Sequence, residues 1–307
     1  MWVLTMIKNN KILSRFYIPP SERWYYYLIF PTIVILLLVN IYPLLYSLVV
    51  SMTNYDFTGS NNLKFVGLAN YIDLIKNNNF LKSMATTFIY VICNVVFELT
   101  LGTAIAMLLY RLGKMGNVLL SFFLLPMMLT PVIVGIMWRF MFNFDFGMIN
   151  FFLEKIGFDK VAFLSDKVHA INYLSIVDMW QWTPYVILLV YGNLQALSKE
   201  QLESASIDGA STIMTFRKIT LPFLSKTLTI CMLIRIMDSI REYDKVYSMT
   251  QGGPGNATET ASYFIYRQAF KFFDIPKATA ASIILLIITI IISNFMVKRM
   301  QKNEYKN

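Results

Sequence analysis

Six apolar stretches, each close to the length of a membrane-crossing helix, divide this chain of 307 residues. An α-helix needs about 20 apolar residues to cross the hydrocarbon core of a bilayer. Hydrophobic residues make up 56% of the chain and charged residues only 15%, so a water-soluble fold of this size could not hide its apolar surface. The pattern predicts an all-α integral membrane protein with six transmembrane helices, at roughly residues 25–50, 84–110, 117–141, 171–196, 223–247 and 277–297.

The distribution of Lys and Arg predicts the orientation of the chain. Residues 1–23 contain four of these cations and precede the first long apolar stretch, so we interpret them as a tail and not as a cleaved signal peptide. With the N-terminus inside, fourteen Lys and Arg residues fall on the cytoplasmic side and nine on the other, where they are spread over long loops. We therefore expect cytoplasmic tails at 1–23 and 299–307, a lipid-embedded domain at 24–298, and no nucleic-acid partner for the net charge of +9.

The second stretch contains Gly102 and Ala106, a pair of small residues four positions apart. Such a pair lies on one face of a helix and lets a second helix approach closely. We interpret it as a packing feature, common to all helical membrane bundles.

One predicted cytoplasmic loop, residues 197–222, is long, polar and helical in pattern. Ser198 with Gln201 three positions later forms a potential capping box, and the helix it starts is expected to run to about Ile207. Gly209 can take the left-handed conformation that ends a helix, and Ser211 can cap a second short helix. These signals predict a helix-turn-helix outside the membrane, and taken alone they favour an ordinary amphipathic connector on the membrane surface.

The spacing within this loop resembles a known pattern. Glu203-Ser204-Ala205 is followed after three residues by Gly209, and after nine more by Ile219, with Leu221-Pro222 close behind. This resembles the EAA motif of the permease subunits of binding-protein-dependent ABC importers, in which Glu-Ala-Ala precedes the same spacing; the sequence departs from it only at Ser204. The resemblance implies an ATPase-coupling segment consisting of Glu203, Ser204, Ala205, Asp208, Gly209, Ile219, Leu221 and Pro222.

The same resemblance implies a mechanism for this segment. Its first helix would seat in a groove on one of two ABC ATPase subunits, Glu203 would meet a basic partner there, and Ala205 and Gly209 would allow close approach. Pro222, at the start of the fifth stretch, would fix the angle between this helix and the membrane span. ATP and Mg would be bound by the ATPases, because the chain has no G-x-x-x-x-G-K-[ST] phosphate loop and needs no cofactor of its own.

Three further segments narrow the resemblance. They are Phe65–Tyr71, Leu124-Leu125-Pro126 followed by Trp138, and Thr250–Thr260, which reads Thr-Gln-Gly-Gly-Pro-Gly-Asn-Ala-Thr-Glu-Thr. Together they resemble carbohydrate-uptake permeases of the maltose and glycerol-phosphate type over residues 24–298. That family implies a bacterial cytoplasmic (inner) membrane, a second homologous permease subunit, an extracytoplasmic substrate-binding protein, and a sugar or oligosaccharide as cargo.

Polar residues within the apolar stretches are candidates for a substrate path, because charged groups in hydrocarbon usually face a bundle interior or an aqueous cavity. Asn94 and Glu98 share one helix face in the second stretch. In the fifth, Arg235, Asp238 and Arg241 are spaced as a compensated charge ladder, with Asp238 as the path candidate. Pairing between helices that only fixes the bundle is an equally good interpretation.

The fourth stretch adds aromatic and amide side chains. Aromatic rings stack on the apolar faces of sugars, and amides bind their hydroxyl groups, so these side chains are also path candidates. Trp and Tyr are frequent at membrane interfaces for other reasons, and packing roles remain open for each of them. The candidates are Trp180, Trp182, Tyr185, Tyr191 and Asn193.

Other function classes remain to be weighed. With His169 as the only histidine, a His-rich metal site is excluded and we expect no metal. A membrane-embedded enzyme could use Glu98, Asp238 and Glu242 as acid or base groups on a lipid-linked substrate. A permease for a glycerol-phosphate derivative and a passive scaffold are further alternatives, and the coupling loop favours the permease.

Overall fold

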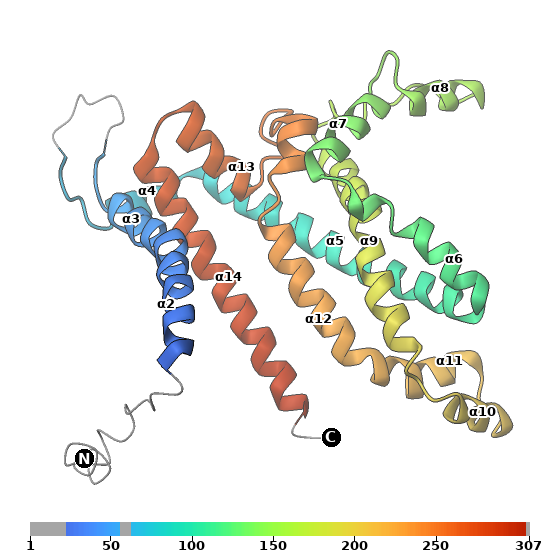
Figure 1. The fold of residues 1–307 in the computed structure, drawn as a ribbon. Helices are drawn as coiled ribbons and strands as arrows, with labels where there is room; N and C mark the ends of the chain where they lie inside the picture. The colour runs from blue at the N-terminus through green and yellow to red at the C-terminus, as the bar shows by residue number, and fades with distance from the viewer. Residues whose placement is uncertain (1–22, 56–62, 305–307) are drawn as a thin grey trace, which may run out of the picture.

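The computed structural model describes residues 23–55 and 63–304, and over these residues the chain is almost entirely helical (Figure 1). The described residues contain no β-strand, and a single antiparallel bridge joins Thr53 to Phe65. Residues 1–22 of the predicted tail at 1–23, residues 56–62, and residues 305–307 of the predicted tail at 299–307 lie outside the described residues. The helices are α2 (Arg23–Leu36), η1 (Leu37–Ile41), α3 (Tyr42–Ser51), α4 (Ala69–Lys76), α5 (Asn78–Arg111), α6 (Lys114–Phe123), η2 (Pro126–Met128), α7 (Pro131–Met141), α8 (Met148–Lys155), α9 (Ala170–Leu194), α10 (Lys199–Ile207), α11 (Thr212–Thr215), η3 (Phe216–Thr220), α12 (Leu221–Ile240), η4 (Val246–Thr250), α13 (Ala261–Tyr266), η5 (Arg267–Lys271) and α14 (Ile275–Glu304).

Several of these helices can cross a membrane. Within the described residues, four are long and apolar enough by length and composition, at Tyr27–Ser51, Asn78–Arg111, Thr212–Ile240 and Ile275–Met300, and one bent pair can form a fifth span. The predicted fourth span corresponds to α9, a 25-residue helix whose polar residues keep it out of this group. The all-helical membrane class is therefore confirmed, and the count of six spans remains a prediction.

The predicted third span, 117–141, is not one straight helix. Its two halves, Lys114–Met128 and Pro131–Met141, meet at an angle of 93°. Leu129 and Thr130 have extended backbones, with ψ of 144° and 139°. A residue that precedes proline is pushed out of the α region, so Pro131 accounts for the break at Thr130.

The predicted fifth span, 223–247, is displaced toward the N-terminus. The helix begins at Thr212, in the predicted coupling loop, and ends at Ile240. A π-helical turn at η3, in which the Leu221 amide bonds to the Phe216 carbonyl, carries it past Pro222 without a break. The chain leaves the helix at Arg241, where charged residues turn toward partners on other helices.

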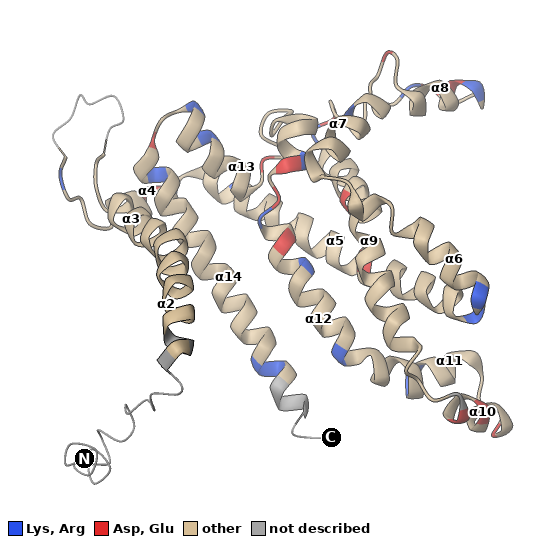
Figure 2. Ribbon diagram, viewed as in Figure 1, with Lys and Arg blue, Asp and Glu red and all other residues tan. Residues whose placement is uncertain are grey.

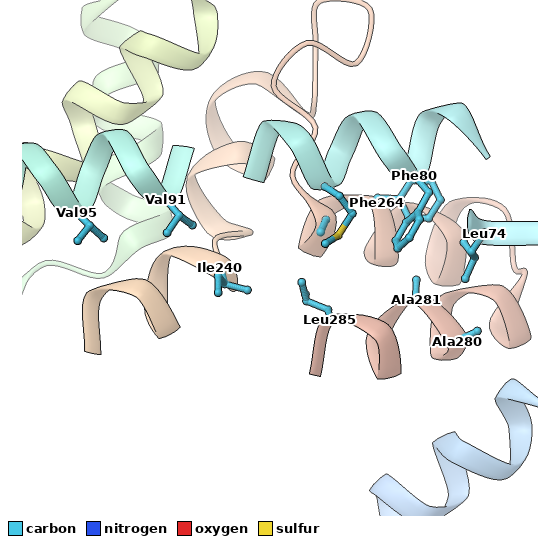
Figure 3. Packing of buried hydrophobic residues seen from close by; sticks show 11 residues of the cluster. Leu74, Phe80, Val91, Val95, Ile240, Phe264, Ala280, Ala281 and Leu285 are labelled. Atoms are coloured by element: carbon cyan, nitrogen blue, oxygen red, sulfur yellow. The ribbon is translucent and has the colours of Figure 1, made fainter. Parts of the chain in front are cut away.

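The long helix α5 lies at the centre of the packing. It contributes side chains to each of three buried apolar clusters: Phe80 and Val91 to the first, Ala106 to the second and Tyr90 to the third. Figure 3 shows the first cluster, in which α5 meets α12, α13 and α14. Against α9 the approach is so close that a Cβ on Gly102 would lie 2.7 Å from Val186 Cβ. The close approach predicted at Gly102 is thus confirmed.

The ends of the helices divide the molecule into two sides. The start of α2, the C-terminal half of α14 and helices α10 and α11 lie toward one side, whereas α4, α8 and α13 lie toward the other (Figure 1). Charged residues gather mostly near these two sides, and α2 and α3 are almost free of them (Figure 2). A smaller charged group lies midway, where α5, α9 and α12 come together.

Candidate functional site

Arg235 is at the centre of the charged group between α5, α9 and α12, and its side chain is only 1% exposed. Its Nε donates to Glu98 Oε2 at 2.6 Å, and its Nη2 donates to Glu98 Oε1 at 3.0 Å. The same Nη2 donates to Asp178 Oδ2 at 2.9 Å. Asn94, one helical turn before Glu98, donates from Nδ2 to the same Asp178 oxygen at 2.8 Å. Three helices are thereby joined through one guanidinium group.

Lys245 extends this group beyond the end of α12, and it is fully buried. Its Nζ lies 2.8 Å from Asp178 Oδ1, 2.7 Å from Glu242 Oε2 and 3.3 Å from Gln181 Oε1. The Gln181 amide in turn donates to the Leu129 carbonyl at 2.9 Å, at the bend between η2 and α7. We call the set Asn94, Glu98, Asp178, Gln181, Arg235, Glu242 and Lys245 the buried charge network.

A cavity of about 370 Å³ adjoins this network, and we call it the central cavity. Two of its lining residues carry aromatic rings, Trp182 and Tyr243, and Trp182 lies over the Arg235 guanidinium at 5.0 Å. Asp238 faces the cavity and pairs with Arg241 at 2.9 Å. The full lining is Pro131, Trp182, Arg235, Asp238, Ser239, Arg241, Glu242, Tyr243, Asp244 and Lys245.

The predicted charge ladder is only partly formed. Asp238 and Arg241 pair as expected, but the Nη1 of Arg235 is 4.0 Å from Asp238, and its short contacts go to α5 and α9. Asn94 and Glu98 do share one face, and both are fully buried within the network and not on the cavity wall. Glu98 and Asn94 therefore fix the helices around the cavity.

The aromatic candidates on α9 are spread along the helix. Trp182 lines the central cavity, whereas Trp180 packs edge-on against Trp138 with ring centroids 5.6 Å apart. Tyr191 donates its hydroxyl to Asn117 at 2.6 Å. Of the others, Tyr185 packs against the apolar cluster of α5 and α9, and Asn193 donates to Thr227. The structure brings Trp182 and Asp238 together at one cavity, and the path role of every candidate stays a prediction.

Three network residues were not among the sequence candidates: Asp178, Gln181 and Lys245. Asp178 had a detectable signal, because it is a carboxylate inside the fourth apolar stretch, where such a residue needs a partner. Gln181 and Lys245 had none, since their contacts depend on how α9 and the segment after α12 meet.

The predicted coupling segment forms two short helices, α10 and α11, joined at Gly209. Gly209 has a φ of +72°, the Gly209 amide bonds to Ser206 O at 3.1 Å, and the Ala210 amide bonds to Ala205 O at 2.9 Å, a Schellman arrangement. Ser211 caps α11 through Met214 N, as predicted. Ser198 occupies the N-cap position of α10, but its side chain makes no capping hydrogen bond, so the predicted capping box is wrong.

Exposure along this segment separates two kinds of residues. Glu203, Ser204, Asp208, Gly209, Leu221 and Pro222 are exposed, whereas Ala205 and Ile219 pack inward. Apolar Ile207 and Ile213 are also exposed, at 86% and 71%. Beneath the segment, a cavity of about 300 Å³ separates it from the ends of α5 and α9. These helices thus present a mixed apolar and acidic surface.

At the opposite side, the loop from Gln251 to Thr260 is a compact turn. Gln251, Gly252, Gly255 and Asn256 all have positive φ. Glu259 is buried here against Arg267, with Oε2 2.9 Å from Nη2. Burial raises the pKa of the Glu259 carboxyl to about 7, against the lowering effect of the Arg267 charge.

Comparison with known proteins gives the family. The model described as binding-protein-dependent transport system inner membrane component matches residues 98–303. The probable ABC transporter permease protein y4oQ of Sinorhizobium fredii is 37% identical over 280 residues, which cover 90% of each chain. The trehalose/maltose transport system permease protein MalF of Thermococcus litoralis is 29% identical, covering 92% of this chain and 94% of that protein.

A solved structure shares the fold. It is the crystal structure of a bacterial ABC transporter involved in the import of the acidic polysaccharide alginate, one chain of which matches with a TM-score of 0.80 and 19% identity, covering 92% of this chain and 96% of that one. The resemblance drawn from the EAA-like spacing is confirmed. The chain therefore belongs to the family of binding-protein-dependent transport system inner membrane components, the permease subunits of ABC importers.

Proposed function

We propose that this chain and a second permease subunit form the pathway by which a sugar or oligosaccharide enters a bacterial cell. The observation that carries the proposal is the central cavity, where the rings of Trp182 and Tyr243 lie beside hydrogen-bonding side chains such as Asp238 and Ser239. Rings that cover apolar C–H faces and carboxylates that accept hydroxyl groups are the two elements that sugar binding needs. A relative of similar length is named as a trehalose/maltose permease, which supports the same cargo class.

The proposed orientation places both termini and helices α10 and α11 in the cytoplasm. Its support is the Lys and Arg asymmetry, together with the common side occupied by the start of α2, the C-terminal half of α14, and α10 (Figure 1). The described cations Arg217, Lys218, Lys298 and Arg299 then lie near the negatively charged inner leaflet.

The proposed driving force is ATP hydrolysis on two ABC ATPase subunits, which hold ATP and Mg. Helix α10 is the docking element, because Glu203 and the apolar Ile207 are exposed on it while Ala205 anchors it inward. Since Thr212–Ile240 is one continuous helix, movement of α10 and α11 reaches the central cavity through α12.

The proposed delivery side is the opposite one, where a substrate-binding protein would dock. A cavity of about 480 Å³ lies there, lined among others by Arg139, Asn143, Gly253 and Pro254. Gly253 and Pro254, from the segment Thr250–Thr260 that resembles carbohydrate-uptake permeases, thus line a hollow suited to receive a protruding loop of a partner.

We assign no catalytic step to this chain. Glu98 is held by two hydrogen bonds from Arg235, and Asp238 is paired with Arg241, so neither carboxylate is placed as a free acid or base. A membrane enzyme would turn over a lipid-linked substrate without ATPases, and assay of the purified chain alone against such substrates would reveal it.

The test of the transport proposal is reconstitution. The chain, its second permease and the two ATPases are placed in proteoliposomes, and uptake of radiolabelled oligosaccharides is followed with the cognate binding protein and ATP. We expect accumulation that needs both additions, and Trp182→Ala should reduce it strongly. Trp180→Ala, a matched change away from the cavity, should reduce it less. Failure of every glycan to accumulate, in a complex that hydrolyses ATP, would refute sugar transport.

A further inference from the structure

We infer that the central cavity admits uncharged glycans and excludes anionic ones. The inference rests on the proposed function, and it narrows the substrate class within it. Acidic cargo is a real alternative, since the structurally similar transporter is involved in the import of an acidic polysaccharide. An anionic ligand needs at least one cation with donors to spare, so the decisive question is whether the cations beside the cavity are free.

The charge of Lys245 is already offset by two carboxylates. Its Nζ lies 2.8 Å from Asp178 Oδ1 and 2.7 Å from Glu242 Oε2, and it donates a hydrogen bond to Gln181 Oε1 at 3.3 Å. The side chain is also fully buried, so a ligand could reach its charge only by displacing one of these partners.

Arg235 is also paired with carboxylates. Its Nε and Nη2 bind both oxygens of Glu98, Nη2 also donates to Asp178, and Nη1 lies 4.0 Å from Asp238 Oδ2. One face of the guanidinium lies under the Trp182 ring, at 5.0 Å. An anion that pulled this group away would leave Glu98 buried without its cation, which is strongly unfavourable.

Among the described residues of the cavity wall, Arg241 is the one exposed cation, with 65% of its side chain accessible. It already donates to Asp238 Oδ1 at 2.9 Å and to the Met237 carbonyl at 3.1 Å. A lone, solvent-exposed and paired arginine is a weak attractor, because its charge is offset by Asp238 and screened by water.

The formal charges around the cavity give a further reason why it does not attract an anionic ligand. Among the described residues that line the cavity, the three carboxylates of Asp238, Glu242 and Asp244 stand beside three cations, Arg235, Arg241 and Lys245, so the wall has no excess of positive charge. Within the described residues, Asp244 has no ion-pair partner. A carboxylated, sulfated or phosphorylated sugar entering here would meet repulsion of like charge in a partly enclosed site.

What the cavity does offer suits a neutral sugar. The carboxylates of Asp238 and Asp244 are hydrogen-bond acceptors, and hydroxyl groups are donors. The rings of Trp182 and Tyr243 supply apolar surface for the C–H faces of a pyranose. The cavity is therefore suited to bind hydroxyl groups and ring faces, and each cation among the described residues that line it is already paired with a carboxylate.

The first test is uptake by the reconstituted complex of permeases, ATPases and binding protein. The probes are maltotriose, its acidic counterpart trigalacturonate, and sn-glycerol 3-phosphate. Uptake of neutral glycan and of neither anion is expected. Uptake of an anion, or uptake confined to a cationic amino-sugar oligosaccharide, overturns the inference while leaving ATP-driven transport intact. If no probe and no other glycan enters, the proposed function itself fails, and the inference with it.

The second test assigns the selectivity to the cavity, independently of the binding protein. Equilibrium dialysis of labelled maltotriose and trigalacturonate against the detergent-solubilised complex gives the ratio of their dissociation constants. Asp244→Asn leaves every described ion pair intact, and together with Asp238→Asn it should shift this ratio about tenfold toward trigalacturonate. Asp159→Asn removes the same charge from an exposed loop and should leave the ratio unchanged.

The ratio of the two dissociation constants shows whether the cavity charges set the selectivity. No shift in the cavity variants, or an equal shift in Asp159→Asn, overturns the role of the cavity charges. Assembly of each variant with its partners, checked by size-exclusion chromatography, separates a change of selectivity from a loss of the complex, and Asp244→Asn alone should give a smaller shift in the same direction.

Discussion

Arg235 on α12 donates two parallel hydrogen bonds to Glu98 on α5, 2.6 Å from Nε to Oε2 and 3.0 Å from Nη2 to Oε1. Both side chains are almost completely buried, and they are 137 positions apart in the sequence. A fork of this kind fixes direction as well as distance, so α12 is held to the central helix at one defined rotation.

Removing one partner of this ion pair should strongly lower the stability of the protein. Arg235→Gln leaves Glu98 buried without its cation and leaves Asp178 with Lys245 alone, and we expect a loss of about 3–5 kcal/mol in stability, measured by thermal unfolding of the detergent-solubilised protein. Arg241→Gln, on the exposed side of the same helix end, should lose less than about 1 kcal/mol. The double variant Arg235→Gln with Glu98→Gln should be more stable than Arg235→Gln alone. Additive losses would show that the two groups do not interact.

The contact at Gly102 predicts a steric effect. Adding a Cβ there places it 2.7 Å from Val186 Cβ and 3.3 Å from the Thr183 carbonyl, so Gly102→Ala should force α5 and α9 apart at a loss of about 1–3 kcal/mol. Gly192→Ala is the matched control, because it lies in α9 with nothing near its added Cβ. Thermal unfolding should show loss in the first variant and none in the second. Equal effects would mean that general helix propensity, and not contact, governs both.

The left-handed backbone of Gly209 predicts a conformational effect at the predicted coupling segment. Its φ is +72°, and space for a Cβ is open, so the backbone alone discriminates among side chains. Gly209→Val should strain the turn by about 1–2 kcal/mol and misplace α10, while Gly209→Asn, which tolerates this conformation, should stay close to wild type. The readout is transport per ATP hydrolysed in the reconstituted complex. Gly209→Asp should show whether added charge uncouples the two even where the backbone is tolerated.

Glu259 predicts a pH dependence of stability. Its folded pKa of about 7 lies above the ordinary 4.5, so the stability that protonation confers is fully present below the ordinary value and is lost as pH rises through about 7. The wild type should therefore lose stability between pH 5 and pH 8 relative to Glu259→Gln, by no more than about 3 kcal/mol. Unfolding temperatures measured across this range give the slopes. The exposed Glu154→Gln should retain the wild-type slope, and a wild-type slope in Glu259→Gln would contradict the assignment.

The sequence predicted the parts of this molecule that depend on local pattern. Long apolar stretches located α5, α9 and α14 closely, and a glycine flanked by short polar helices located the turn at Gly209. These features depend on residues near each other in the chain, so periodicity and turn chemistry are enough to find them.

The angles and contacts between distant parts of the chain could not be predicted from local sequence patterns. Pro131 marks the position of the break at Thr130, but the angle of 93° between the two halves depends on how they pack against other helices. The end of α12 at Ile240 depends on partners that Glu242 and Lys245 find on other segments. Asp178 belongs to the site only because α9 packs beside α5. A single sequence does not show which buried acid pairs with which base, because those residues are far apart in the chain.

The helix from Thr212 to Ile240 is continuous, and Arg235 ties it to α5 and α9 near one end. If the helix pivots at Arg235, the arm toward α11 is about 34 Å long and the arm toward Ile240 about 8 Å, at 1.5 Å per residue. The two lengths differ by a factor of about four, so a displacement of ~4 Å at α11 would move the end of the helix beside the central cavity by only ~1 Å. If α10 docks on an ATPase as proposed, a large movement of that partner would therefore produce a small displacement at the cavity.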